Sequence, residues 1–509
     1  MSVAKRAVSG TFANAASFAL QFVQTIALVP ILLSGWGSET YGLWLAIQSV
    51  YALIITVDVG HQNYVGNEFL RLYTTDVPRL RATLAAGLIG VAILGAIELG
   101  LALLLIATGA LPWALGLPGN QLPASVPIAL CVLIAAWIVQ GSLGGLATRL
   151  YPPAGLYARS IWLGNAYRVA SAIAVAATVM LRGGILAAAL AISAVTSCFM
   201  AIVWWDLRSR FANVYPFWKG GTIGGAWPNI GRSLVLTASS VVAQLQQHGV
   251  ILLVAGRMGL ALVPAYTTIR TLANVFLQAS GVISGPLSPE VVRFHSLNQN
   301  DKVADIVGAL WFVGGLCTHL GLSAALPLLQ PLYASWTRGE YAFDPMLFAL
   351  LAVAVSLRTL GSPLLSLLAG LNQLRAQAII AVTQTAVVLA VAAALLPSIG
   401  LVATGVAVAL GELIGGVVLP LHFFRVVAPS ASRIIGVGTT VAAAAPCALH
   451  GAVFLAFGAG GLPAPIAAAA SAGSACFAYG FLWTRLAPHV RARLWMLAMS
   501  PLRRLKPRS

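Results

Sequence analysis

Five charged residues lie near the centres of segments that are otherwise almost entirely apolar. Arg168, Arg270 and Arg358 are cations, and Glu98 and Glu412 are anions. At the centre of a membrane helix each such group costs roughly 2.5–3.5 kcal/mol on insertion scales. We therefore expect all five to face the interior of a helix bundle, where charged side chains typically serve a substrate or an ion.

The three central cations are all arginine, although the chain also contains lysine. A guanidinium is a rigid fork that can bind a phosphate through two hydrogen bonds, whereas an ammonium group is a point charge. Tyr266, Arg270, Asn274 and Gln278 recur every four residues, which places them on one helix face. The pattern predicts an anionic, phosphorylated cargo. The alternative is that the arginines form structural ion pairs with the glutamates.

Carboxylates within the spans are candidates for the ion that drives transport or for a gate. Desolvation opposes ionisation of a buried carboxylate, so such a group can take up a proton or a cation. One long apolar run ends in the polar stretch VDVGHQNYVGNEFLR, where helix-end solvation is the alternative explanation. The candidates for ion coupling or gating are Asp58, Glu98, Glu412 and Glu68.

Composition identifies the elements that must hold these side chains. Hydrophobic residues make up 59% of the 509 residues and charged residues 8%, whereas soluble proteins carry about 25% charged residues. Apolar runs of about 20 residues recur along the chain, and they lack the alternation of barrel strands. We predict an all-α polytopic membrane protein whose helices lie near residues 8–34, 42–66, 82–106, 125–148, 157–181, 184–206, 231–256, 262–286, 304–333, 344–370, 375–397, 400–424, 434–456 and 463–484.

The positions of lysine and arginine predict the orientation of this chain in the membrane. Cytoplasmic loops are enriched in both residues. With the N-terminus inside, most of the 29 lysines and arginines fall in inner loops and tails, and the outer loops hold Arg182, Arg257 and Arg338. Both termini are therefore predicted to be cytoplasmic. The net charge of +17 follows from this bias, so nucleic acid is not an expected partner.

The two halves of the chain share a polar pattern. Gln21 and Gln24 follow Asn14 and Ser17 on the first predicted helix, and Gln244 and Gln247 follow Thr237 and Ser240 on the seventh with the same spacing. The match predicts two parallel six-helix repeats with the glutamines facing a cavity, and helix–helix hydrogen bonding is the alternative. The predicted parts are an N-lobe (1–230), a C-lobe (231–425), a helix pair (426–485) and a basic cytoplasmic tail (486–509).

The sequence carries no motif for a nucleotide, a metal or covalent catalysis. The glycine–lysine phosphate loop of ATPases is absent, and the histidines lack metal-ligand spacing. We therefore expect no enzymatic activity, no cofactor and no metal.

Short motifs near the N-terminus resemble those of a transporter family. Gly35-Trp-Gly37, Tyr41-Gly-Leu-Trp44, Asp58-Val-Gly60 and Asn67-Glu68 resemble the start of bacterial polysaccharide exporters, and the region with Tyr266, Arg270, Pro289 and Arg293 resembles their second half. These are the O-antigen-type flippases of the multidrug/oligosaccharidyl-lipid/polysaccharide exporter superfamily. Many members have twelve spans, and the fourteen predicted here are shared with the peptidoglycan-precursor flippases.

The resemblance implies a V-shaped pair of six-helix lobes around a cationic lumen in the bacterial inner membrane. It implies alternating-access translocation of an undecaprenyl-pyrophosphate-linked oligosaccharide to the outer leaflet, for surface polysaccharide synthesis. Membrane lipids and the polysaccharide polymerase machinery are the other expected partners. One alternative is a cation-coupled multidrug antiporter of the same fold, although its cargo is usually cationic. A membrane-embedded polymerase or glycosyltransferase is a second alternative, but its large outer catalytic loop is not evident.

Overall fold

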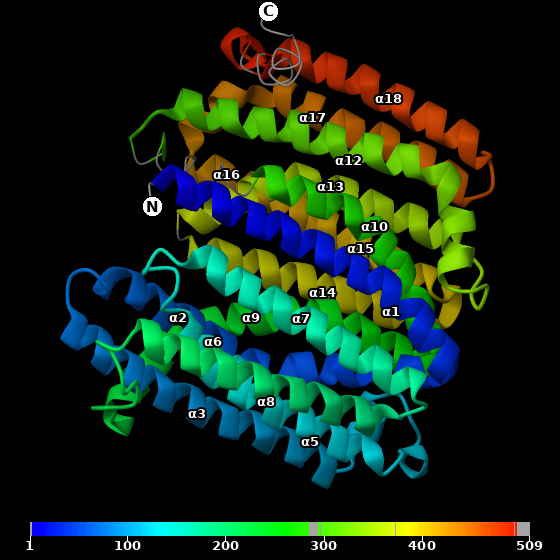
Figure 1. Cartoon of the computed structure of the whole chain (residues 1–509). Coiled ribbons are helices and arrows are strands. Elements are labelled where there is room, and N and C mark those ends of the chain that lie inside the picture. Colours follow the sequence, from blue (N-terminus) through cyan, green and yellow to red (C-terminus); the bar gives the residue numbers. More distant parts are fainter. Residues whose placement is uncertain (1–2, 285–293, 296, 372, 493, 496–509) are drawn as a thin grey trace, which may run out of the picture. The chain divides into compact units, whose positions relative to one another are not determined.

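The computed structural model describes residues 3–284, 294–295, 297–371, 373–492 and 494–495, and helices dominate this part of the chain (Figure 1). The helices are α1 (Val3–Ile54), α2 (Thr56–Leu72), α3 (Val77–Ala107), α4 (Ala110–Ala114), α5 (Ser125–Trp137), α6 (Gly145–Thr148), α7 (Tyr157–Met180), α8 (Ile185–Arg210), α9 (Ile223–Met258), α10 (Val263–Ser284), α12 (Asn300–Trp336), α13 (Pro345–Gly370), α14 (Leu374–Ile399), α15 (Val402–Gly411), α16 (Leu419–Val427), α17 (Pro429–Gly458) and α18 (Ala464–Arg485). Two π-helical turns, η2 (Ile138–Gly144) and η5 (Glu412–Val418), join α5 to α6 and α15 to α16.

The number of membrane spans agrees with the prediction of about fourteen. Thirteen helices among the described residues are long and apolar enough to cross a membrane. The first, Phe12–Ile54, is broken at Gly37, where φ is 71° and ψ is 176°, a conformation that glycine adopts easily and other residues rarely. Beyond Gly37 the chain turns back and continues into α2 (Figure 1). This region therefore accounts for the first two predicted spans.

Several spans begin at capping residues that the sequence supplies. The Asp76 carboxylate accepts a hydrogen bond from the Arg79 amide at 2.9 Å at the start of α3. Asp344 accepts from the amides of Met346 and Leu347 at the start of α13, both at 3.0 Å. Such caps satisfy amides that the first turn of a helix leaves without a partner.

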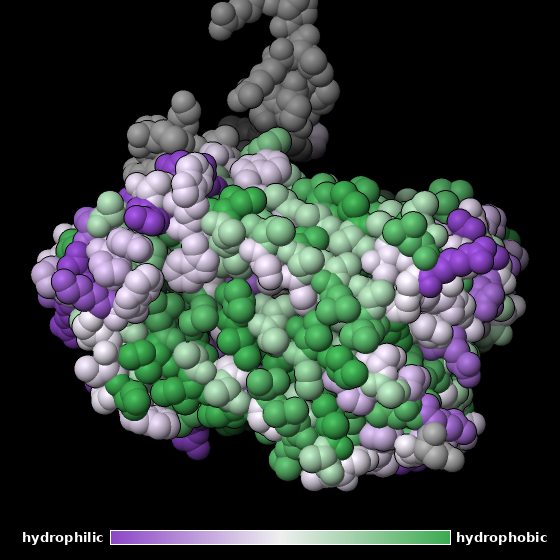
Figure 2. Space-filling model, turned by 60° about the horizontal axis from the view of Figure 1, so that its bottom comes forward, coloured by the Kyte–Doolittle hydropathy of each residue, from purple (hydrophilic) through white to green (hydrophobic). Residues whose placement is uncertain are grey.

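The surface of the described residues has the composition expected of a membrane protein. Apolar side chains cover much of the visible face, and hydrophilic side chains gather towards its edges (Figure 2). Exposed residues within the spans include Ile173, Ile202 and Phe477, each more than half exposed. These side chains are placed to contact lipid.

The chain divides into two compact units. The first comprises Met1–Tyr266 and Trp336–Tyr341, and the second comprises Thr267–Ser335 and Ala342–Ser509. In the first unit α9 packs against α2, α1 and α3, α7 packs against α1, and α8 packs against α5. Gly60 permits the contact of α2 with α9, because a Cβ there would overlap the backbone of Thr237. The predicted lobes rest on internal repetition, whereas these units rest on packing, so the lobe boundaries stay a prediction.

One end of the first unit is held by an apolar core and an ion-pair cluster. Phe69, Leu84 and Phe211 are among the buried side chains that join α2, α3 and the end of α8. Beside them the Asp206 carboxylate accepts from Arg159 at 2.6 and 2.9 Å, and from the Tyr151 hydroxyl at 2.7 Å. The cluster joins α8 to α7 and to the turn after α6.

In the second unit, a buried polar network ties α17 and α18 to α12. The Tyr479 hydroxyl lies 2.7 Å from His319 Nδ1, and the Ser471 hydroxyl lies 2.7 Å from both His450 Nδ1 and the Ser323 hydroxyl. The side chains of this network other than Tyr479 are essentially inaccessible to solvent, namely His319, Ser323, His450 and Ser471. The last two spans are therefore bound into the second unit by specific hydrogen bonds as well as by apolar packing.

Candidate functional site

A pair of buried carboxylates lies between α2 and α3 in the first unit. The Asp58 amide donates to Glu98 Oε1 at 3.2 Å, and Gln62 Nε2 donates to Asp58 Oδ2 at 2.9 Å. Asp58 and Glu98 are both 0% exposed. Thus two of the four predicted carboxylates come together, from the consecutive helices α2 and α3, which pack side by side.

Polar groups from the fourth span surround this pair. Ser142, in the π-helical turn η2, and Trp137, directly before it, both face Asp58. Ser142 Oγ and Trp137 Nε1 are placed to donate to the Asp58 carboxylate, whereas Glu98 Oε2 is buried and has no hydrogen-bond partner among the described residues. Because buried polar atoms are normally hydrogen-bonded, this oxygen is a candidate to hold a proton or to bind a water molecule or a small cation.

Arg149, which directly follows the span Ser125–Thr148, is a cation near the carboxylate pair. Its aliphatic stem packs on Gly66 of α2, since a Cβ at Gly66 would lie 3.2 Å from Arg149 Cδ. Burial lowers the pKa of Arg149 below its usual range, and the charge of Asp58 opposes this shift. The signal in the sequence was weak, because an arginine directly after a span is usually a topological charge.

The second unit contains an arginine–glutamate cluster. Arg358 Nη1 lies 3.1 Å from Glu412 Oε1, with 50% of the arginine side chain and 4% of the glutamate side chain exposed. Gln384 also hydrogen-bonds Glu412, and Arg270 acts on the same carboxylate through its charge. Arg358 therefore forms the ion pair that the sequence left open as the alternative, with Arg270 close enough to contribute.

Local backbone geometry positions Glu412. It begins the π-helical turn η5, which packs directly against α13. A Cβ at Gly361 of α13 would overlap the carbonyl oxygen of Gly416 in this turn. Only glycine at that position allows α13, which carries Arg358, to approach the turn that carries Glu412.

The third central arginine is held by the first helix. Arg168 Nη1 donates to the Ser17 hydroxyl at 3.1 Å and lies 3.5 Å from the Ser17 carbonyl oxygen. Arg168 is half-buried, and both residues belong to the first unit. Ser17 is one of the polar residues that recur along the first helix together with Gln21 and Gln24. This polar pattern therefore includes a hydrogen-bond acceptor for Arg168.

The remaining predicted site residues are spread over both units. Tyr266 is buried, Asn274 is half-buried, and the side chain of Gln278 lies outside the described residues, as do Pro289 and Arg293. Gln21 and Gln247 are exposed, and Gln24 and Gln244 are half-buried. Glu68 pairs with Arg71 at 2.9 Å on the surface of α2. Their roles in binding or coupling stay predictions.

Sequence reasoning did not find Gln384, Ser142 or Trp137 as neighbours of the buried carboxylates. Each is a common residue in a helix, with no spacing that distinguishes it. Tertiary packing and the two π-helical turns bring them to the clusters. π-helical turns often occur at functional sites, but their positions are not evident from residue types.

No protein-family model matches the sequence, and no curated protein matches it significantly. Solved structures do. The inward closed conformation of the lipid II flippase MurJ matches with a TM-score of 0.61 at 11% identity, over 93% of this chain and 98% of that one. An inward-facing multidrug resistance MATE family transporter of the MOP superfamily matches with a TM-score of 0.60 at 15% identity, over 81% and 96%. An outward-facing MATE transporter matches with a TM-score of 0.58 at 14% identity, over 84% and 96%.

These likenesses confirm the expected fold class. They extend over almost the whole of each solved chain. The names of these proteins indicate different cargoes, namely drugs for the MATE transporters and lipid II for MurJ. The chain therefore has the fold that MATE transporters and the lipid II flippase MurJ share, and it is a multi-pass membrane protein.

Proposed function

We propose that this protein is a flippase for an undecaprenyl-pyrophosphate-linked oligosaccharide, which it moves from the inner to the outer leaflet by alternating access. The observation that carries the proposal is the position of Arg358. It lies near the middle of the span Pro345–Ala369, yet half of its side chain is exposed. A charge exposed to lipid at this depth is costly, so we infer that the guanidinium faces a water-filled path.

The charges around Arg358 favour an anionic headgroup. Glu412 neutralises one of the two cations that act on it, so Arg270, Arg358 and Glu412 together keep a net positive charge. Arg358 Nη1 donates a hydrogen bond to Glu412 Oε1. Among the described residues, the other guanidinium nitrogens of Arg358 have no hydrogen-bond partner. A pyrophosphate entering the path could bind these nitrogens while its lipid tail stays in the membrane.

The extent of the structural likeness also supports a flippase. The MurJ structure matches 93% of this chain, whereas the MATE structures match 81% and 84%. The last two spans are firmly bound to α12 and α13, which is consistent with a fourteen-span transporter. MATE transporters support the second candidate, a cation-coupled multidrug antiporter, through the fold itself and through the buried Asp58–Glu98 pair as a cation site.

Reconstituted vesicles can distinguish the two candidates. A fluorescent polyprenyl-pyrophosphate-linked sugar should reach the opposite leaflet only when the protein is present, and the cationic dye ethidium should not be transported. Arg270→Ala should abolish translocation of the lipid probe, and Arg270→Lys should retain part of it because the charge remains without the fork. Ethidium transport without translocation of the lipid probe would contradict the flippase proposal.

A further inference from the structure

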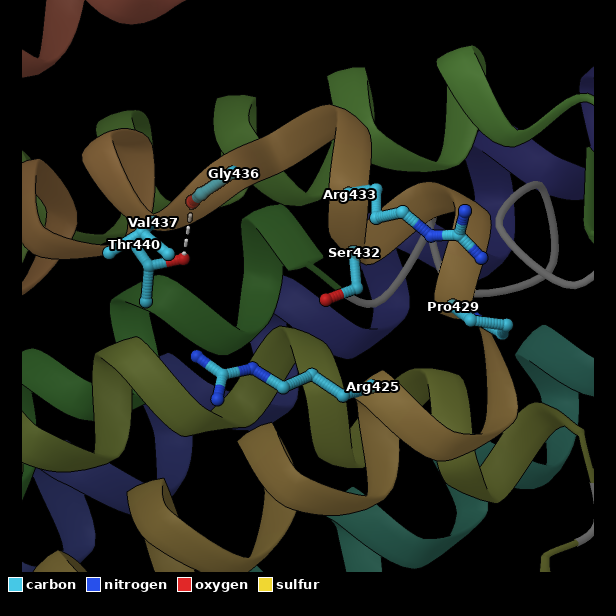
Figure 3. A pocket seen from close by; sticks show the side chains of 7 residues that line it. All are labelled: Arg425, Pro429, Ser432, Arg433, Gly436, Val437 and Thr440. Atoms are coloured by element: carbon cyan, nitrogen blue, oxygen red, sulfur yellow. Dashed lines mark hydrogen bonds between the residues drawn. The ribbon is translucent and has the colours of Figure 1, made fainter.

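A cavity lies at the junction of α16 and α17 in the second unit, away from the arginine–glutamate cluster. It has a volume of about 450 Å³, within the range of small-molecule sites. Its lining residues are Arg425, Pro429, Ser432, Arg433, Gly436, Val437 and Thr440 (Figure 3). Two of the seven are cations, and none is a carboxylate.

A break in α17 shapes this cavity. At Gly436 φ is 67° and ψ is 166°, so the first residues of α17 run in a different direction from the rest of the helix. Figure 3 shows Arg425 extending from α16 along the cavity towards Thr440, while Arg433 lines the other side from the first segment of α17. Ser432 points between the two arginines.

The polar groups of the cavity have bonding capacity left for a ligand. Within the described part of the chain, Arg425, Arg433 and the Ser432 hydroxyl have no recorded hydrogen bond or ion pair. Thr440 Oγ1 donates to the Gly436 carbonyl at 3.0 Å, so it can still accept but has used its proton. The Arg425 guanidinium and the Ser432 hydroxyl are donors suited to a phosphate, and Arg433, whose guanidinium points the opposite way in Figure 3, adds positive charge to the cavity.

The surroundings of the cavity are those of a lipid headgroup. A single residue, Ala428, separates the spans Val402–Val427 and Pro429–Gly458, so the arginines lie at the boundary of the membrane. Val437 and Val441 are 72% and 58% exposed and share a helix face that leads away from the arginines. A phospholipid would match both features, because its anionic phosphate would lie beside the arginines and its acyl chain along these valines.

We propose that this cavity binds an anionic phospholipid, whose phosphate contacts Arg425 and Ser432 and whose charge is also balanced by Arg433. The central arginines and the Asp58–Glu98 pair are not among the residues that line this cavity. The bias of basic residues predicts that it faces the cytoplasm, where a negative leaflet attracts arginine.

Native mass spectrometry of the purified full chain tests the proposal by titration with phosphatidylglycerol, with phosphatidylcholine as the zwitterionic comparison. We expect one phosphatidylglycerol to bind in preference to phosphatidylcholine. Each arginine near an anionic lipid contributes about a factor of five to binding, so R425Q should weaken this binding about fivefold and the double variant R425Q/R433Q about twenty-fivefold. The matched control is R375Q, which removes an exposed arginine of the same unit outside the cavity and should bind as the unmodified protein does.

A second variant keeps the test decisive if the double variant does not fold. V437E places a carboxylate at an exposed lining position without removing either arginine, and it should weaken phosphatidylglycerol binding while leaving phosphatidylcholine unaffected. Unchanged binding in both R425Q/R433Q and V437E would overturn the proposal.

Competition experiments separate the sources of the phosphate. Inorganic phosphate at the same concentration should not displace the lipid, because it makes no contact with the valines. Displacement by free phosphate would reassign the cavity to a soluble anion. Displacement by substoichiometric undecaprenyl pyrophosphate would reassign it to the cargo lipid, and either result would reject a resident phospholipid.

Discussion

Arg358 and Glu412 could serve the cargo or only the fold, and paired substitutions separate these roles. Removing one member of a buried ion pair leaves an uncompensated charge, whereas removing both does not. We expect R358M to lower the abundance of the protein in the membrane, because it leaves the buried Glu412 without its partner, and R358M/E412Q to restore it. If Arg358 binds cargo, the double variant should still fail to translocate the lipid probe. Normal abundance together with normal translocation in the double variant would show that the pair is structural only.

The Asp58–Glu98 pair predicts how transport depends on pH. Two carboxylates that share a dry site strongly favour states in which they hold a proton or a cation between them. D58N or E98Q removes one of the two groups, so the change in translocation rate between pH 6 and pH 8 should become smaller. The control is E340Q, which removes an exposed loop carboxylate and should keep the original profile. Profiles of D58N and E98Q that parallel the unmodified profile would place ion coupling elsewhere.

Among the helices, α13 and the π-helical turn η5 approach each other very closely at Gly361, so a substitution there tests whether this contact is needed for stability. A Cβ at Gly361 would overlap the Gly416 carbonyl oxygen, and backbone cannot move aside as a flexible side chain can. G361A should therefore reduce the stability by about 3 kcal/mol. The matched substitution G480A, at a helical glycine of α18 with no atom near the added Cβ, should leave stability unchanged or slightly higher. Melting temperatures in detergent would compare the two, and equal values would show that the close approach is not required.

The helices themselves were largely predictable, because long apolar runs and the glycines and prolines between them determine where spans begin and end. The predicted span 157–181 corresponds to α7 (Tyr157–Met180), and 463–484 corresponds to α18 (Ala464–Arg485). The second span was predicted to end at residue 66, but α2 continues to Leu72 since its polar end still packs on the core around Phe69. The π-helical turns and the breaks at Gly37 and Gly436 were not predictable from periodicity.

For the candidate site, the residue types indicated which side chains belong to it, but the sequence did not show which of these side chains contact each other. Full charges in apolar runs identified Glu98, Arg358 and Glu412, because their cost in lipid demands an explanation. Asp58 was predicted from the polar stretch that ends one of these runs. Which carboxylate meets which cation depends on the packing of helices far apart in the sequence. Repetition of a polar stripe likewise indicated related halves but not that α9, from the second repeat, packs on α2 in the first unit.

For the complete chain, the proposed cargo makes transport sensitive to the membrane potential. A pyrophosphate carries negative charge outward, and an inside-negative potential favours this by about 2.3 kcal/mol per charge per 100 mV. The residues Arg270, Arg358 and Glu412 together compensate part of that charge while the headgroup is bound. We therefore expect a potassium diffusion potential, negative inside the vesicles, to accelerate movement of the lipid probe from the inner to the outer leaflet, and a potential of opposite sign to slow it. R270A should remove the movement under both conditions. An antiporter that exchanges a cationic drug for a single proton would carry no net charge, so rates independent of potential would favour the drug over the lipid-linked anion.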